Sequence, residues 1–451
     1  MKKFTRVFLI VAVAGLAFAG LTCPNAWAQP RAMEDKTIDA KMQAEMIDSL
    51  CGVLDTLYVF PDVAKKLESH LRDKLRKKAY AGITSTRELA DSLTADLRSV
   101  NNDRHLSVGY LSDADIALIK ADTTGAASAE EQLRQSRSRN FGFRELKLLT
   151  GNVGYLRFDG FSDFNEAGPT AIAAMNFLAN ADAVIFDLRY NGGGSTKMIQ
   201  LLTSYLFDEP VHLNDFYIRH NDSTQQFWTA GHVFGPRLAK TDVYILTSHR
   251  TFSAAEEFSY NLKNLKRATI IGDTTGGGAH PNVLVHWPNL HLTASIPFGK
   301  AINPITHTNW EGVGVAPDIV VASDNALDVA QREALKKILT RTIKEDDRFP
   351  LEWSLAGLDA KINPPKVDVA SLARYAGTYG PRAIKFENGD LYYHRAPNPW
   401  AKMIPMSDSL FRFEELDYFR LEIIRDGQGN PTALVGHYDN GMVDRSDRSG
   451  S

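Results

Sequence analysis

The middle of this chain alternates short runs of β-forming residues with segments of helical length. Four such runs are apolar along almost their whole length and lie at residues 153–158, 183–188, 243–247 and 268–272. Strands of this kind are typical of a sheet that is buried on both faces. Helix-length segments separate most of the runs, at residues 168–178, 197–206 and 253–265. The alternation predicts an α/β core, which we place at residues 141–346 and expect to be closed by a helix over residues 327–343.

A second region precedes this core. Between residues 36 and 115, apolar residues recur at i, i+3 and i+4 spacing in three series, and Ser85 with Glu88 forms a capping-box signature before the third series. These patterns predict three helices in a small N-terminal helical domain. The stretch between residues 121 and 140 is polar and poor in aromatic residues, and we interpret it as a flexible connector or surface loop.

A third region follows the core. Beyond residue 365 the chain carries short β-type runs and an Asn388-Gly389 pair between two of them, which is a strong hairpin signal. Residues 366–451 are therefore predicted to form a small antiparallel β domain. A length of 451 residues is in keeping with several domains. The formal net charge of −3 gives no reason to expect nucleic acid or an anionic membrane surface as a partner.

The N-terminus has the pattern of a secretory signal peptide. Three basic residues within the first six precede an apolar run that ends near Leu21, and Ala26-Trp27-Ala28 supplies a small-x-small cleavage site. The run is shorter than the roughly 20 residues that a spanning helix prefers. We expect residues 1–28 to be removed, which gives an exported protein, periplasmic or secreted, with no stable membrane insertion. Cys51 is then the only cysteine left, so no internal disulfide can form.

A glycine-rich turn follows the second β-type run, in the sequence from Asp187 to Gly194. Without Cβ atoms, the backbone of Gly192 and Gly193 can turn sharply and bring N–H groups close to an anion. In an acyl-transfer enzyme that anion is the oxyanion of the tetrahedral intermediate. Phosphate binding is the rival interpretation, but the spacing is neither that of a P-loop nor that of a dinucleotide-binding turn.

A serine stands where a helix is expected to begin after the third β-type run. Ser253 lies in the sequence from Thr247 to Phe258, three residues before Glu256. Locally, the pair is typical of a helix N-cap with a capping box. A nucleophile at a helix N-terminus is also favourable, because the helix dipole stabilises developing negative charge.

Two more segments complete a recognisable series: a second glycine-rich turn, Gly272 to Gly278, and the segment from Asn309 to Asp318. In this order the four motifs resemble the tail-specific (C-terminal processing) protease family, the S41 serine peptidases, over roughly residues 40–340. The branch that contains the interphotoreceptor retinoid-binding protein modules and the tricorn core protease is the most similar. The resemblance implies a ClpP/crotonase-like α/β core.

The resemblance also implies catalytic roles. It makes Ser253 the nucleophile, and it matches Gly192 or Gly193 and the N–H of Ala254 to the oxyanion hole. Many family members use a lysine in a Gly-Lys-Gly motif as the base, but this chain has three glycines at residues 276–278. The tricorn-like branch uses a histidine that is oriented by a carboxylate, and His105 and Glu311 fall at the matching places.

Some features of the family are missing from this chain. Arg104 stands where tricorn-like members place a serine before the histidine, and Ala254 stands where some carry an acidic specificity residue. A preference for basic side chains before the cleaved bond is therefore not supported. The stretch at residues 121–140 is too short for an inserted PDZ domain, so recognition of free C-termini is not supported either.

No cofactor or metal is expected. Four histidines crowd the region from His280 to His307, but none has the spacing of a zinc motif. Glu256 and Glu257 are interpreted as helix capping and surface charge, not as a carboxylate pair for glycoside hydrolysis.

The sequence therefore predicts an exported serine endopeptidase that acts on a peptide or protein through an acyl-enzyme on Ser253. His105 would act as base and then as acid, and Glu311 would orient the imidazole. A catalytically silent module that binds hydrophobic ligands and an esterase-type acyl hydrolase are the alternatives that the same scaffold allows.

Overall fold

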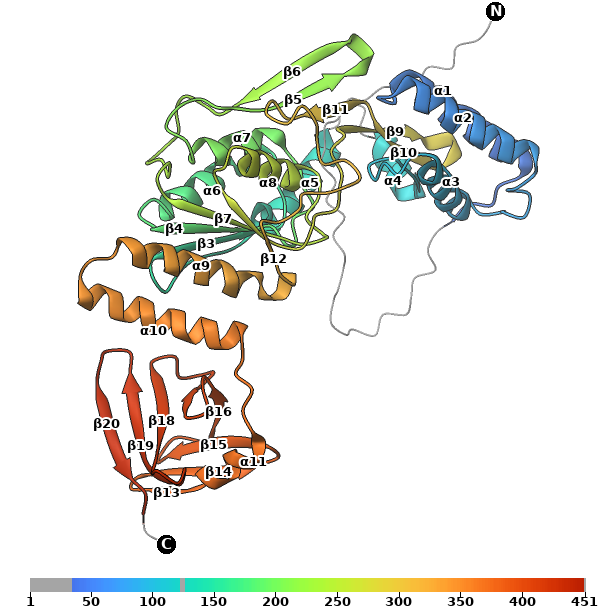
Figure 1. Cartoon of the computed structure of the whole chain (residues 1–451). Coiled ribbons are helices and arrows are strands. Elements are labelled where there is room, and N and C mark those ends of the chain that lie inside the picture. Colours follow the sequence, from blue (N-terminus) through green and yellow to red (C-terminus); the bar gives the residue numbers. More distant parts are fainter. Residues whose placement is uncertain (1–34, 122–125, 450–451) are drawn as a thin grey trace, which may run out of the picture. The chain divides into compact units, whose positions relative to one another are not determined.

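The computed structural model describes residues 35–121 and 126–449 (Figure 1). Its contacts divide the chain into two compact units. The first comprises Met1–Lys147 and Tyr155–Ser323, and the second comprises Leu148–Gly154 and Asp324–Ser451. The expected signal peptide at residues 1–28 lies outside the described residues.

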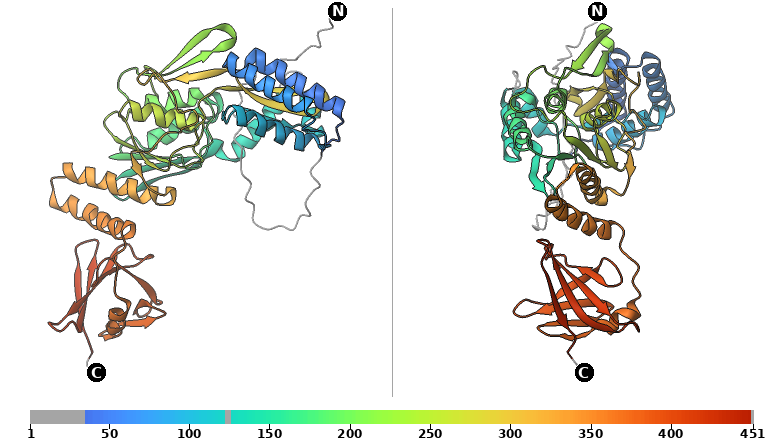
Figure 2. Two further views of the ribbon diagram at one scale, coloured as in Figure 1. Left: turned by 45° about the vertical axis from the view of Figure 1, so that its right-hand side comes forward. Right: turned by 60° about the vertical axis from the view of Figure 1, so that its left-hand side comes forward.

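Three helices begin the described part of the first unit, as the apolar repeats predict: α1 (Ala40–Leu57), α2 (Pro61–Arg76) and α3 (Thr86–Val100). The Ser85 hydroxyl caps α3 by accepting a hydrogen bond from the Glu88 N–H at 3.0 Å. The apolar stripes of the helices meet in one leucine-rich core, and Figure 2 shows the three helices side by side. The predicted N-terminal helical region is confirmed.

A three-stranded antiparallel sheet shares this core. Its strands, in order, are β1 (Ser107–Tyr110), β10 (Leu292–Pro297) and β9 (Asn282–Trp287). The register pairs Ser107 of β1 with Ser295 of β10. Apolar side chains of all three strands pack with those of the helices. Strands from late in the chain therefore hold the loop between α3 and β1, which carries His105.

The expected connector between residues 121 and 140 is wrong over most of its length. Helix α4 (Asp113–Ala121) reaches its start, and α5 (Ala126–Ser138) occupies most of the remainder. The segment is polar but consists largely of Ala, Glu, Gln and Arg, which are strong helix formers. A polar composition does not by itself indicate a loop, because the helix propensity of these residues favours a helix.

A six-stranded sheet forms the centre of the first unit. Its order is β12 (Ile319–Val320), β8 (Thr269–Gly272), β7 (Asp242–Thr247), β4 (Ala183–Asp187), β3 (Val153–Phe158) and β2 (Phe143–Leu149). The pairs β4–β7, β7–β8 and β8–β12 are parallel. Every residue of β4 is buried, as the apolar runs predict for a sheet that is covered on both faces.

Three helices cover one face of this sheet: α6 (Phe164–Phe177), α7 (Thr196–Ser204) and α8 (Ala254–Asn264). Their apolar side chains pack with Phe158, Phe186 and Ile245 in a single core. A further small antiparallel sheet has the order β11 (Gly299–Ile302), β5 (His212–Ile218) and β6 (Ser223–Trp228). The α/β core is confirmed.

From Asp324 onward, the second unit consists of helices followed by a β meander. The helices are α9 (Ala326–Arg341), α10 (Glu345–Ile362) and α11 (Val369–Leu372). The strands follow one another in the sheet in chain order: β13 (Gly377–Tyr379), β14 (Arg382–Glu387), β15 (Asp390–Arg395), β16 (Ala401–Pro405), β17 (Leu410–Arg412), β18 (Phe419–Arg425), β19 (Pro431–Tyr438) and β20 (Val443–Asp447). Every neighbouring pair is antiparallel.

The hairpin that was predicted from Asn388-Gly389 is present in this meander. Glu387 pairs with Asp390, so the two residues between them form the whole turn. Both have positive φ, 51° at Asn388 and 86° at Gly389, as a two-residue hairpin turn requires. The antiparallel C-terminal domain is confirmed. In the described part of the chain, no helix is both long enough and apolar enough to cross a membrane.

Candidate active site

The motifs picked out in the sequence meet at one edge of the six-stranded sheet. Three of the turns follow the carboxyl ends of β4, β7 and β8, which are parallel neighbours. Backbone hydrogen bonds join the turns: Phe252 N–H donates to the Asn191 carbonyl at 3.1 Å, and Gly276 N–H donates to the Thr251 carbonyl at 2.9 Å. Gly312 N–H donates to the Gly277 carbonyl at 3.0 Å and so brings in the fourth motif.

Ser253 occupies the N-cap of α8 in an unusual backbone conformation. Its φ is 53° and its ψ is −121°, a region that a residue with a side chain rarely adopts. Such strain costs on the order of 1–3 kcal/mol and persists only where the surroundings impose it. An ordinary N-cap residue has an extended backbone, so capping alone does not explain this conformation.

Gly193 is the closest neighbour of the Ser253 turn in the glycine motif. Its φ is 105°, and a Cβ atom there would lie 2.7 Å from the Ser253 Cβ and 2.9 Å from the Ala254 nitrogen. No side chain fits in that space. Glycine at position 193 is therefore required for the backbone of this turn to lie so close to the backbone around Ser253.

Two N–H groups beside Ser253 are free to bind an anion. The Gly193 N–H donates to Asn191 Oδ1 at 2.9 Å. Within the described residues, the N–H groups of Gly192 and Ala254 have no hydrogen-bond partner. Ala254 is the first residue of α8, where the helix leaves its N–H groups unpaired. Gly192 is exposed, so its N–H can reach a bound molecule.

The His105 side chain lies against this turn. Its ring packs on that of Phe252 with centroids 4.8 Å apart, and a Cβ on Gly278 would come within 2.7 Å of its Cε1 atom. Within the described residues, neither imidazole nitrogen is hydrogen-bonded, and Nδ1 is buried. Burial lowers the pKa of His105 to about 4, against the charge of Asp103, which raises it. The imidazole is therefore neutral at neutral pH and able to accept a proton.

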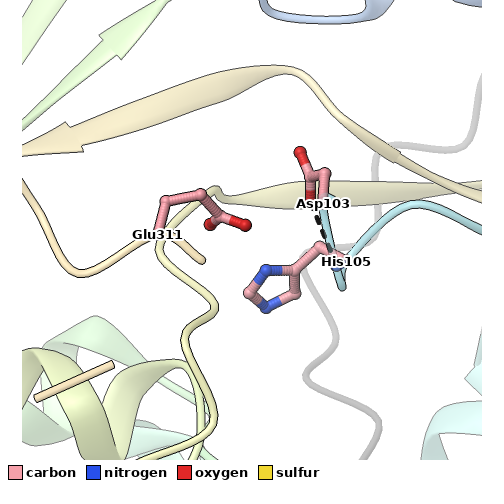
Figure 3. Close-up of side chains that lie close together, drawn as sticks. All are labelled: Asp103, His105 and Glu311. Carbon is pink, nitrogen blue, oxygen red and sulfur yellow. Dashed lines mark hydrogen bonds between the residues drawn. The ribbon is translucent and has the colours of Figure 1, made fainter. Parts of the chain in front are cut away.

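Glu311 points toward the imidazole of His105, as Figure 3 shows. Its Oε2 accepts a hydrogen bond from the Ala279 N–H at 2.6 Å, whereas its Oε1 is buried and has no partner among the described residues. Burial raises the pKa of Glu311, and the charge of Asp103 raises it further. Ligand atoms of Asp103, His105 and Glu311 all lie within 4.8 Å of one another.

Sequence reasoning missed the pair formed by Asp103 and His280. His280 Nδ1 lies 2.8 Å from Asp103 Oδ2, which also accepts a hydrogen bond from the Tyr58 hydroxyl at 3.1 Å. Asp103 Oδ1 accepts the His105 N–H at 3.0 Å. Burial alone would raise the pKa of Asp103, but the hydrogen bond and charge of His280 lower it. The position of Asp103 two residues before His105 is the only local feature of the sequence that could have indicated its place in the site.

Glu256 was interpreted partly as surface charge, and that interpretation is wrong because its side chain is fully buried. It does cap the helix, since the Ser253 N–H donates to its Oε2 at 3.0 Å. It also accepts the N–H groups of Gly277 and Gly278 at 2.6 and 2.8 Å. Burial raises the pKa of Glu256 to about 7, against these hydrogen bonds. The Glu256 side chain therefore joins the turn that carries Ser253 to the second glycine-rich turn.

The neighbouring Glu257 is not surface charge either. It is 3 % exposed, and burial raises the pKa of its carboxyl to about 8. Both glutamates lie in the first turn of α8. Their burial follows from packing against the glycine turns and β5, which an α-helical pattern by itself does not reveal.

Two family models match this chain. The model of peptidase family S41 matches residues 152–321, and a model described as the N-terminal domain of this peptidase in eukaryotic IRBP matches residues 38–139. The two matched ranges together span more than half of the chain. The chain belongs to peptidase family S41. It is a serine-type peptidase, and peptides or proteins are the substrates that membership of the family implies.

Solved structures are similar to this S41 peptidase at low identity. The photosystem II D1 C-terminal processing protease is 14% identical, with 62% of this chain and 94% of that chain covered and a TM-score of 0.41. A lipoprotein from Streptococcus agalactiae is 15% identical, with 69% and 99% covered and a TM-score of 0.44. Mature CPAF is 12% identical, with 68% and 99% covered and a TM-score of 0.46. Membership of peptidase family S41 rests on the two family models and not on these structures.

The predicted site residues fall into two groups in the S41 peptidase. Ser253, Ala254, Gly192 and Gly193 form one continuous surface of two turns, and His105 and Glu311 face each other beside it. Within the described residues, no hydrogen bond joins His105 to Ser253 or to Glu311. The triad and the oxyanion hole therefore stay predictions.

Proposed function

We propose that this peptidase is an endopeptidase that cleaves peptide bonds through an acyl-enzyme on Ser253, with His105 as general base and Glu311 as the orienting carboxylate. The strained backbone of Ser253 against the Gly193 turn is the observation that carries the proposal. A serine that is held on a sharp strand-to-helix turn exposes its hydroxyl to a substrate, which is the arrangement that nucleophilic serines use.

The proton path follows from the imidazole. Neutral His105 accepts the Ser253 hydroxyl proton on Nε2 as Oγ attacks the substrate carbonyl, and it later gives the proton to the leaving amine. Its Nδ1–H then donates to Glu311 Oε1. Both of these atoms are buried and lack a hydrogen-bond partner within residues 35–121 and 126–449. A small rotation that joins them removes two unsatisfied groups, each of which costs about 1–3 kcal/mol.

The oxyanion is stabilised by backbone donors. The Ala254 N–H at the start of α8 and the N–H of Gly192 or Gly193 bind the oxygen on which negative charge develops. The helix dipole adds to this stabilisation. The Gly192 N–H is the donor that Asn191 leaves free.

Labelling with a fluorophosphonate serine-hydrolase probe tests the proposal. The wild type should be labelled, and both Ser253→Ala and His105→Ala should abolish labelling. Ser195→Ala is the matched control, because Ser195 is also a helix N-cap beside the glycine turn and its side chain makes no capping hydrogen bond. A folded wild type that takes up no label would favour a silent binding module instead.

We also propose that the peptidase is exported. The basic, apolar and small-x-small pattern of residues 1–28 supports this proposal. Mass spectrometry of the protein from the periplasm or medium of expressing cells should find Gln29 as the N-terminal residue. An intact Met1 form that stays in the cytoplasm would refute the proposal.

A further inference from the structure

Three metal-ligating side chains converge beside the proposed nucleophile. Asp103 and His105 come from the loop between α3 and β1, and Glu311 comes from the segment after β11 (Figure 3). Their ligand atoms lie within 4.8 Å of one another. Ligands of tetrahedral zinc lie about 3.4 Å apart, since zinc binds nitrogen and oxygen at roughly 2.0–2.2 Å. A shift of about an ångström therefore brings the three atoms to bonding distance of one ion.

Two buried atoms in this group, Nδ1 of His105 and Oε1 of Glu311, have no hydrogen-bond partner in the part of the chain that the structure describes. The imidazole nitrogen carries a lone pair in one tautomer, and the carboxylate oxygen carries lone pairs that nothing occupies. Asp103 adds a second carboxylate at the same place, so like charges face each other. A small divalent cation would give His105 Nδ1 and Glu311 Oε1 a partner and would balance the charge of the two carboxylates.

The surroundings hold the two carboxylates in position. His280 Nδ1 lies 2.8 Å from Asp103 Oδ2 and 3.5 Å from Glu311 Oε2. The Ala279 N–H fixes Glu311 Oε2, and the Tyr58 hydroxyl fixes Asp103 Oδ2. Hydrogen-bonded partners of this kind orient the ligands of metal sites, and their loss typically lowers metal affinity by about 10–100-fold.

We propose that Asp103, His105 and Glu311 form a Zn²⁺ site that switches the peptidase off. One imidazole nitrogen with two carboxylate oxygens suits zinc, whereas magnesium and calcium prefer oxygen ligands alone. Three protein ligands leave a fourth position for water. The ion takes His105 Nδ1 and Glu311 together, so the imidazole can no longer donate to Glu311. Binding does not depend on the proposed triad, but the inhibition rests on it.

Calorimetric titration of the metal-free full chain with ZnCl₂ tests the binding. One ion should bind per chain, and His105→Ala and Glu311→Gln should each weaken binding at least tenfold. Ser253→Ala should bind as the wild type does. His286→Ala is the matched control, because this half-buried histidine on β9 bonds to Thr293 and belongs to no ligand set. Binding that is unchanged in His105→Ala would overturn the site.

A second measurement does not depend on the folding of variants. Co²⁺ bound to the wild type should give the visible absorption of a tetrahedral nitrogen–oxygen site, and Zn²⁺ should displace it. Absence of that absorption, together with absence of calorimetric binding, would also overturn the site.

Probe labelling with and without Zn²⁺ separates this proposal from the proposed function. Labelling of Ser253 that slows with Zn²⁺ and recovers with a chelator supports both. A wild type that binds Zn²⁺ but takes no label refutes the catalytic proposal and leaves the metal site standing. Labelling that is unaffected by bound Zn²⁺ refutes the inhibition.

Discussion

Replacing Gly193 by alanine tests whether the turn that carries Ser253 depends on the close approach of the Gly193 backbone. The new Cβ would lie 2.7 Å from the Ser253 Cβ, 2.8 Å from the Phe252 carbonyl oxygen and 2.9 Å from the Ala254 nitrogen. Two of these three atoms are backbone, so no side-chain rotation relieves the clash. The φ of 105° adds strain of its own. Overpacking of about 1–3 kcal/mol and backbone strain of about 1–3 kcal/mol together predict a loss of roughly 2–6 kcal/mol in the free energy of unfolding.

Gly192→Ala is the internal control. A Cβ at Gly192 meets nothing within 4 Å, and the residue has no positive φ. Its effect on the free energy of unfolding should stay within about 0.5–1 kcal/mol. Urea unfolding of the two variants and the wild type measures the difference, and probe labelling of Gly193→Ala should fall as Ser253 is displaced. Equal stabilities of the two variants would refute the packing argument.

Three further predictions concern buried groups. Because the pKa of Glu256 is raised to about 7, the folded state binds more protons than the unfolded state between about pH 4.5 and 7. The free energy of unfolding should therefore fall by roughly 3 kcal/mol as pH rises across that window. Urea unfolding at several pH values should show a weaker dependence of this free energy on pH in Glu256→Gln than in the wild type, and an equal dependence would contradict the prediction. Burial raises the pKa of Cys51 to about 11, so its thiol should resist a disulfide reagent until the protein unfolds. Asp187→Asn should lower the free energy of unfolding by about 3–5 kcal/mol, because the buried carboxylate accepts hydrogen bonds from the Arg189 guanidinium at 2.7 and 2.9 Å. A loss under about 1 kcal/mol, measured by thermal unfolding, would contradict this prediction.

Much of the fold is readable from local patterns. The buried strands of the α/β core and the Asn388-Gly389 hairpin depend on short-range chemistry, which a sequence displays directly. Helix α5 is not predicted by the apolar pattern, because that pattern is weak and the helix depends on the helix propensity of polar residues.

The site is readable only in part. Ser253 and the glycine turns are local motifs that stand out in the sequence. The contact of Asp103 with His280 joins residues 177 positions apart, and no spacing rule reveals such a pair. Glu256 occupies an ordinary capping position, and its four hydrogen bonds depend on how the second glycine turn folds back over α8.

The register of β1 with β10 has a consequence for the timing of activity during biosynthesis. His105 precedes strand β1, which pairs with residues 292–295, and Glu311 is later still in the chain. A ribosome must therefore have released most of the core before the proposed base and its carboxylate can meet Ser253. Under the proposed mechanism, a nascent chain that already carries Ser253 remains unable to digest itself or its neighbours until synthesis of the core is complete.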